Sequence, residues 1–166
     1  MTNGMEILLI EDNPEDVEIT LRAFRKYHLS GKVQVVRDGE EALECLFSTG
    51  RYAEPSVCSN VRLILLDIKL PKMDGIEILQ QCKSDQRTKN IPVVVLTSSR
   101  EENDLTNCYK FGVNSYVVKS IDSSRYTDAV QQLGLYWLGL NQLPSEIHSA
   151  RGRAGSLQCE HVNDGE

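Results

Sequence analysis

Short apolar runs alternate along this chain with longer amphipathic stretches. The apolar runs cover residues 7–10, 33–36, 63–66, 93–96 and 116–118, and a polar residue follows each of them. Runs of this length that are apolar on both faces are typical of strands buried in a parallel sheet. The run at 33–36 is the weakest because Gln34 interrupts it.

Between these runs, apolar residues recur three and four positions apart, which predicts helices. The first helix begins after Asn13-Pro14, the fourth ends at Gly112, and the last covers about 124–140. Strands that alternate with helices predict an α/β fold. We expect a doubly wound, five-stranded parallel sheet with five helices and right-handed crossovers.

Composition narrows the class of protein. The 166 residues suffice for one domain, expected at 5–143, followed by a polar tail at 144–166 that is expected to be disordered. A net charge of −6 argues against nucleic-acid binding, which needs a basic face. No stretch is apolar enough to span a membrane, and no secretory signal precedes the first strand. Five scattered cysteines without metal-site spacing predict reduced thiols and a cytoplasmic location.

Chemically active residues stand where the predicted strands end. Glu11-Asp12, Asp67, Thr97 and Lys119 each follow or close an apolar run. Because ligands of open parallel sheets bind beyond the carboxyl ends of the strands, these side chains are expected to meet at one edge. Each has a simpler explanation taken alone: a helix cap, the start of a turn, or a solvated lysine. Their arrival at four strand ends together favours a common site.

Three carboxylates in one pocket need a cation. Two carboxylates about 4 Å apart repel by roughly 4 kcal/mol at an effective dielectric near 20. Lys119 offsets one charge, and oxygen ligands without nearby His or Cys favour Mg²⁺. Such a site suits phosphoryl chemistry, with a carboxylate as nucleophile and the ammonium and hydroxyl bound to phosphoryl oxygens.

Four sequence blocks at these positions resemble the response-regulator receiver domains of two-component signalling, whose fold is flavodoxin-like. They are Ile-Glu-Asp-Asn at 10–13, Leu-Asp-Ile-Lys-Leu-Pro-Lys-Met-Asp-Gly at 66–75, Val-Leu-Thr-Ser at 95–98 and Tyr-Val-Val-Lys at 116–119. The resemblance covers most of the chain. It identifies the protein as a signalling module rather than an enzyme, apart from slow intrinsic dephosphorylation.

The resemblance implies a role for each site residue. Asp67 would accept a phosphoryl group from a sensor histidine kinase, and Thr97 and Lys119 would contact that group. Tyr116 would be the aromatic switch that turns inward when Thr97 moves toward the phosphate. The remaining implication is a Mg²⁺ site formed by Glu11, Asp12, Asp67 and the backbone carbonyl of Lys69.

Two further features concern the end of the chain and the partners. The residues after Pro144 are too few for an output domain, so a stand-alone receiver is expected to signal through protein contact. The apolar segment at 134–140 packs either on the protein's own sheet or in a homodimer seam. The chain also resembles small regulators paired with phytochrome-type histidine kinases, which implies a dimer through the faces of the fourth and fifth helices.

The chain departs from the family at Ser120. Receivers usually carry a proline after the lysine with a cis bond before it, and a cis bond before serine is costly. Whether the Lys119–Ser120 peptide bond is cis stays open. The departure is also the basis for an alternative function, that of a degenerate receiver that docks partners without phosphorylation. A Mg²⁺ phosphohydrolase is disfavoured because Lys69 stands where an acid would be needed. A flavin binder is disfavoured because Glu11-Asp12 would repel a phosphate.

Overall fold

A computed structural model of the protein describes residues 4–54 and 60–144. The tail predicted at 144–166 therefore lies outside the described residues except for Pro144. No helix within the described ranges is both long and apolar enough to cross a membrane.

The core of the molecule is a five-stranded parallel sheet in the order β2-β1-β3-β4-β5. Its register pairs Leu9 with Val35 on one side and with Leu65 on the other. The central strands are fully buried, which confirms the expectation from their apolar runs. The strand bounds are β1 Ile7–Ile10, β2 Val33–Val36, β3 Leu63–Leu66, β4 Val93–Thr97 and β5 Ser115–Val118.

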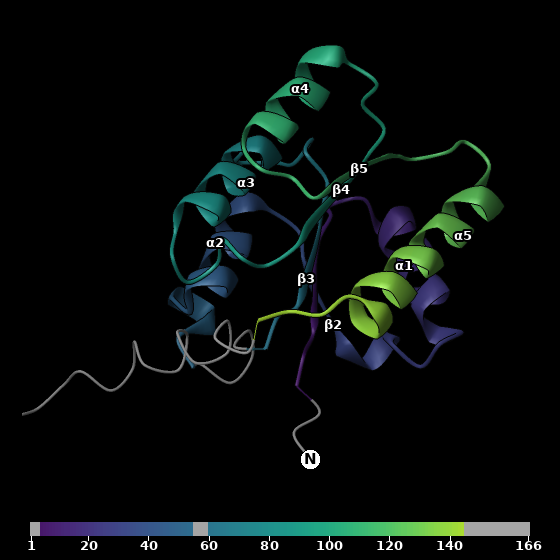
Figure 1. The fold of residues 1–166 in the computed structure, drawn as a ribbon, viewed down its shortest axis with the longest axis horizontal. Coiled ribbons are helices and arrows are strands. Elements are labelled where there is room, and N and C mark those ends of the chain that lie inside the picture. The colour runs from purple at the N-terminus through teal and green to yellow at the C-terminus, as the bar shows by residue number, and fades with distance from the viewer. Residues whose placement is uncertain (1–3, 55–59, 145–166) are drawn as a thin grey trace, which may run out of the picture.

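The five α-helices of the described residues cover the two faces of the sheet (Figure 1). Helices α1 and α5 contact each other on one face, and α2, α3 and α4 lie on the other. The predicted doubly wound α/β fold is thereby confirmed. The helix bounds are α1 Pro14–Arg25, α2 Gly39–Phe47, α3 Gly75–Ser84, α4 Glu102–Lys110 and α5 Ser123–Gly134, with 3₁₀ turns at Ser30–Lys32 and Gly50–Tyr52.

The last helix differs from its prediction at 124–140. Regular α-helix ends at Gly134, and a π-helical segment covers Leu135–Leu140. A Cβ on Gly134 would lie 2.6 Å from the ring of Phe24, so the close approach of α1 to α5 requires glycine here. Trp137 packs on the core between these helices and the sheet, whereas Tyr136 and Leu140 remain exposed.

The cysteines follow the expectation of packed, reduced thiols only in part. Cys82 and Cys108 are buried and carry reduced thiols, and the Cys82 Sγ donates to the carbonyl of Thr88 at 3.7 Å. Cys45 is disulfide-bonded, so the prediction of reduced thiols is wrong for this residue. Spacing along the chain did not reveal which sulfur atoms the fold brings together.

Candidate functional site

The site lies at the carboxyl edge of the sheet, where backbone hydrogen bonds continue beyond the strands. The amide of Asp67 donates to Ile10 O at 3.0 Å, and the amide of Lys119 donates to Thr97 O at 2.7 Å. These bonds place the residue after each strand next to its counterpart on the neighbouring strand. The predicted convergence of Glu11, Asp67, Thr97 and Lys119 at this edge therefore follows from the parallel register.

Three carboxylates form an acidic group at this edge. One oxygen from each of Glu11, Asp12 and Asp67 lies within 4.8 Å of the others. Glu11 and Asp67 are buried, with 2% and 8% of their surface exposed, while Asp12 is exposed. Because all donors are carboxylate oxygens, with one side open to solvent, this group can bind a hard divalent cation. Burial raises the pKa of Glu11 to about 7, although its bond with Lys119 acts to lower it.

Lys119 is the cation of the site. Its Nζ donates to Glu11 Oε2 at 2.6 Å, Asp16 Oδ2 at 2.8 Å and Asp67 Oδ2 at 3.0 Å. Burial alone would lower the pKa of Lys119, but the bonds to Asp16 and Glu11 outweigh it and raise the pKa well above its ordinary value. The bond from Lys119 to Ser120 is trans, since no peptide bond among the described residues is cis. Lys119 thus reaches Asp67 without the proline that is usual in the resembled family.

Asp67 is held by its own loop and by the next helix. The amide of Lys69 donates to Asp67 Oδ1 at 3.2 Å. Gly75 begins α3, and a Cβ there would lie 2.4 Å from the carbonyl oxygen of Asp67. Glycine is therefore required here by the close approach of the backbone at Asp67 and Ile68. The carbonyl of Lys69 remains a predicted metal ligand.

A second polar network begins at Thr97 and extends to α4. Thr97 is fully buried, and its Oγ1 accepts a bond from the amide of Ser99 at 3.2 Å. The Ser99 hydroxyl donates to Asp104 Oδ2 at 2.5 Å, and Lys69 Nζ lies 3.3 Å from the same oxygen. The hydroxyl of Tyr116 donates to the carbonyl of Ser99 at 3.1 Å. The predicted switch pair Thr97 and Tyr116 is thus connected through the loop before α4.

Hydrogen bonds identify which of the candidate residues at the strand ends cap a helix. Asn13 caps α1, since its Oδ1 accepts bonds from the amides of Glu15 at 2.9 Å and Asp16 at 3.3 Å. Glu11 contributes by accepting the amide of Asn13 at 3.1 Å. By contrast, the helix after Thr97 begins at Glu102, and its N-cap Glu101 makes no capping bond through its side chain. Thr97 is a strand-end residue rather than a cap.

Sequence reasoning missed the roles of Asp16 and Asp104. Asp16 lies in the first turn of α1, beside the end of β1, and its acidic position after a predicted cap was the available signal. Asp104 lies two helical positions into α4, where only its burial at 8% exposed distinguishes it from other acidic residues. The role of Asp16 depends on a contact with Lys119, 103 positions away, and that of Asp104 on contacts with Ser99 and Lys69.

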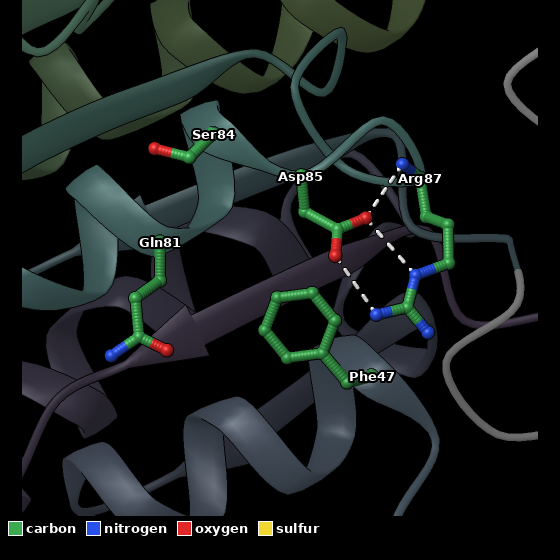
Figure 2. A pocket seen from close by; sticks show the side chains of 5 residues that line it. All are labelled: Phe47, Gln81, Ser84, Asp85 and Arg87. Atoms are coloured by element: carbon green, nitrogen blue, oxygen red, sulfur yellow. Dashed lines mark hydrogen bonds and ion pairs between the residues drawn. The ribbon is translucent and has the colours of Figure 1, made fainter.

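A hollow of about 340 Å³ lies away from the acidic group, and Figure 2 shows the side chains that line it. It is lined by the ends of α2 and α3, which are at the amino edge of the sheet because the helices run antiparallel to the strands. Arg87 pairs with both oxygens of Asp85, at 3.0 and 2.9 Å, and its guanidinium lies 4.8 Å from the centre of the Phe47 ring. Since this pair is neutral overall, the hollow provides no charge for phosphoryl chemistry.

Comparison with known proteins agrees with this geometry. The family described as "Response regulator receiver domain" matches residues 7–131. The probable methanogenesis regulatory protein FilR2 of Methanothrix harundinacea is 41% identical over 138 residues, covering 83% of this chain and 86% of FilR2. Response regulator Rcp1 of Synechocystis is 37% identical over 139 residues, covering 84% of this chain and 92% of Rcp1.

Solved structures give the same result. The phosphorylated cyanobacterial phytochrome response regulator RcpA superposes with a TM-score of 0.79 at 40% identity, over 86% of this chain and 99% of RcpA. The Mn²⁺-bound form of Rcp1 superposes with a TM-score of 0.78 at 35% identity, over 85% and 99% of the two chains. The fold, the acidic edge and these matches agree, and the chain belongs to the response regulator receiver domain family.

Proposed function

We propose that the protein is a phosphoacceptor in two-component signalling and that Asp67 receives the phosphoryl group from a sensor histidine kinase. The observation that carries the proposal is the position of the Asp67 carboxylate. It is fixed by the Lys69 amide through Oδ1 and faces Lys119 Nζ through Oδ2. A carboxylate held in this way is oriented for in-line attack, which accounts for much of the rate in phosphoryl transfer.

In the proposed reaction, an Asp67 oxygen attacks phosphorus and forms the acyl phosphate as the bond from phosphorus to the histidine nitrogen of the kinase breaks. Lys119 binds a phosphoryl oxygen and offsets the charge that accumulates, and the Thr97 hydroxyl binds another. Tyr116 would respond to phosphorylation by turning inward when Thr97, and Ser99 with it, moves toward the phosphoryl group. The acyl phosphate is then lost by slow intrinsic hydrolysis, because Lys69 offers no carboxylate to activate water.

Mg²⁺ is the cation proposed for the acidic group, bound by Glu11, Asp12, Asp67 and the Lys69 carbonyl. When bound, it would neutralise the charge that accumulates on the phosphoryl oxygens. The all-carboxylate donor set fits a hard cation, and the Mn²⁺-bound structure of the relative Rcp1 supports a divalent metal in general. The preference for Mg²⁺ rests on its oxygen chemistry.

The partner is proposed to be a phytochrome-type histidine kinase, because RcpA is described as a phytochrome response regulator. The receiver domain is proposed to cover 5–143, to act in the cytoplasm, and to form a homodimer through the faces of α4 and α5. The exposed side chains of Tyr109 on α4 and of Leu135 and Tyr136 after α5 support that seam. Light scattering of the purified protein measures the dimer directly, and a monomer at high concentration would contradict it.

The test of phosphoryl acceptance is labelling by acetyl phosphate with Mg²⁺, followed by intact-protein mass spectrometry. Wild type is expected to gain one phosphoryl group and Asp67→Asn none. Asp85→Asn is the matched control, since it removes a carboxylate at the amino edge of the sheet and should label normally. Equal labelling of Asp67→Asn and wild type would refute the assignment, and no labelling of wild type would favour the docking alternative.

A further inference from the structure

Lys119 is surrounded by more acidic partners than a phosphoryl-binding lysine needs. An ammonium has three N–H donors, and all three are used here by carboxylate oxygens at 2.6, 2.8 and 3.0 Å. Two of these partners, Glu11 and Asp67, also belong to the acidic group that can bind a divalent cation. Asp16 is the third partner and lies outside that group.

The shared carboxylates create a conflict that Asp16 resolves. A divalent cation in the acidic group would draw on the oxygens of Glu11 and Asp67 and would repel the nearby ammonium. Phosphorylation would further convert the Asp67 carboxylate into an acyl phosphate. The Asp16 carboxylate is used by neither event, so its ion pair with Lys119 at 2.8 Å can persist through both.

Asp16 is also fixed more firmly than a surface carboxylate. Its amide donates to the Asn13 cap at 3.3 Å, and its carbonyl accepts the Thr20 hydroxyl at 2.8 Å. Thr20 in turn lies 3.4 Å from the Tyr126 hydroxyl on α5, which connects the two helices that cover this face. Its carboxylate stands in the first turn of α1, where the helix dipole favours negative charge.

The loop after Lys119 gives the lysine little restraint of its own. Ser120 follows it in place of a proline, so the backbone there keeps the freedom that a ring would remove. The amide of Lys119 is fixed by Thr97 O, but the long side chain depends on its ion pairs. We propose that Asp16 is a positioning residue, which holds the Lys119 ammonium in place for the phosphoryl group while Glu11 and Asp67 are engaged.

This inference rests on the proposed phosphoacceptor function, and its test separates the two. Labelling rates with acetyl phosphate and Mg²⁺ are measured for wild type, Asp16→Asn, Asp16→Ala and Asp16→Glu. Both Asn and Ala variants are expected to label about tenfold more slowly, which is the effect of losing one charge-assisted bond of about 1.4 kcal/mol. Asp16→Glu should recover most of the rate. Glu15→Gln, an exposed change of charge in the same helical turn, is the matched control and should label normally.

A second measurement separates positioning from a general loss of structure or metal. The ¹⁵Nζ resonance of Lys119 is followed by NMR with Mg²⁺ and beryllofluoride, a phosphoryl mimic. It should stay sharp in wild type and broaden in Asp16→Ala, while the Mg²⁺ concentration for half-saturation changes less than about threefold. If Asp16→Ala labels at the wild-type rate with a sharp Lys119 resonance, Asp16 has no positioning role. If wild type itself is not labelled, the phosphoacceptor function fails and the role of Asp16 fails with it.

Discussion

Two partly buried lysines at opposite edges of the sheet show what makes one of them chemically useful. Lys119, at the carboxyl edge, donates to three carboxylates. Lys83, at the end of α3, also has three oxygen acceptors: Ile91 O at 2.8 Å, Asn114 Oδ1 at 3.1 Å and Lys89 O at 3.2 Å. The number of bonds is the same, but all acceptors of Lys83 are neutral.

The pKa values of the two lysines shift in opposite directions. Burial lowers the pKa of Lys83, because its three neutral acceptors do not compensate the lost hydration of its charge. The pKa of Lys119 is raised, since its bonds with Asp16 and Glu11 outweigh its burial. Full hydrogen bonding thus gives a structural connection between segments at Lys83. At Lys119 the same number of bonds to charged partners holds a protonated ammonium beside the Asp67 carboxylate.

The largest expected effect comes from exchanging the two lysines for methionine. Lys119→Met should lower the rate of labelling by acetyl phosphate about 100-fold or more, because the developing phosphoryl charge loses its cation. Lys83→Met should label at the wild-type rate. Both rates are read from intact-protein mass spectra over time. If the two variants label at the same rate, Lys119 is not the cation that phosphoryl transfer requires.

The next effect concerns the pH dependence of stability without metal. The pKa of Glu11 is about 7 in the folded protein and ordinarily 4.5, so the folded state binds more protons between these values. Glu11 therefore contributes stability below about pH 4.5 that is lost as the pH rises through 7, on the order of 3 kcal/mol. Urea unfolding in a metal chelator should show this decline, and Glu11→Gln should flatten it. An unchanged slope in the variant would assign the decline to other groups.

A smaller effect is expected for metal binding. Asp12→Asn should weaken Mg²⁺ binding about tenfold, since one of three carboxylates around the cation is lost. The affinity is measured by calorimetry or by amide NMR shifts. Asp85→Asn is the control at the amino edge, where Mg²⁺ should shift no resonance. If Mg²⁺ shifts the amide resonances near Lys83 as much as those near Asp67, it does not bind specifically at the carboxyl edge.

The sequence predicted the fold and the main contents of the carboxyl edge for one physical reason. Buried parallel strands read as apolar runs, and the polar residue that ends each run must emerge at the same edge. Glu11, Asp67, Thr97 and Lys119 were therefore identified without any knowledge of contacts. The alternation of strands and helices fixed the layers in the same way.

What the sequence did not predict depends on the distance between segments. Asp16 reaches Lys119 across 103 positions, and Lys83 reaches Asn114 across 31. Neither pair has a local pattern, because Asp16 and Lys83 are ordinary helix residues, and their partners lie just after and just before β5. The π-helical end of the last helix was missed for another reason. Its apolar residues continue the helical spacing of α5, and nothing in that spacing indicates the change from α-helix to π-helix at Leu135.

The smallest expected effect is on the stability of the two lysine variants at alkaline pH. Because the folded pKa of Lys83 lies below its ordinary 10.5, the unfolded chain binds more protons just below that pH, and Lys83 makes stability rise as pH approaches 10.5. Lys119 has a folded pKa above 10.5, so its contribution is lost as pH rises past that value. Relative to wild type, Lys83→Met should therefore lose stability and Lys119→Met should gain it with rising pH, each by about 1 kcal/mol or less. Urea unfolding at pH 8, 10.5 and 11.5 measures both changes. If stability shifts with the same sign in the two variants, charged and neutral acceptors affect a buried lysine alike.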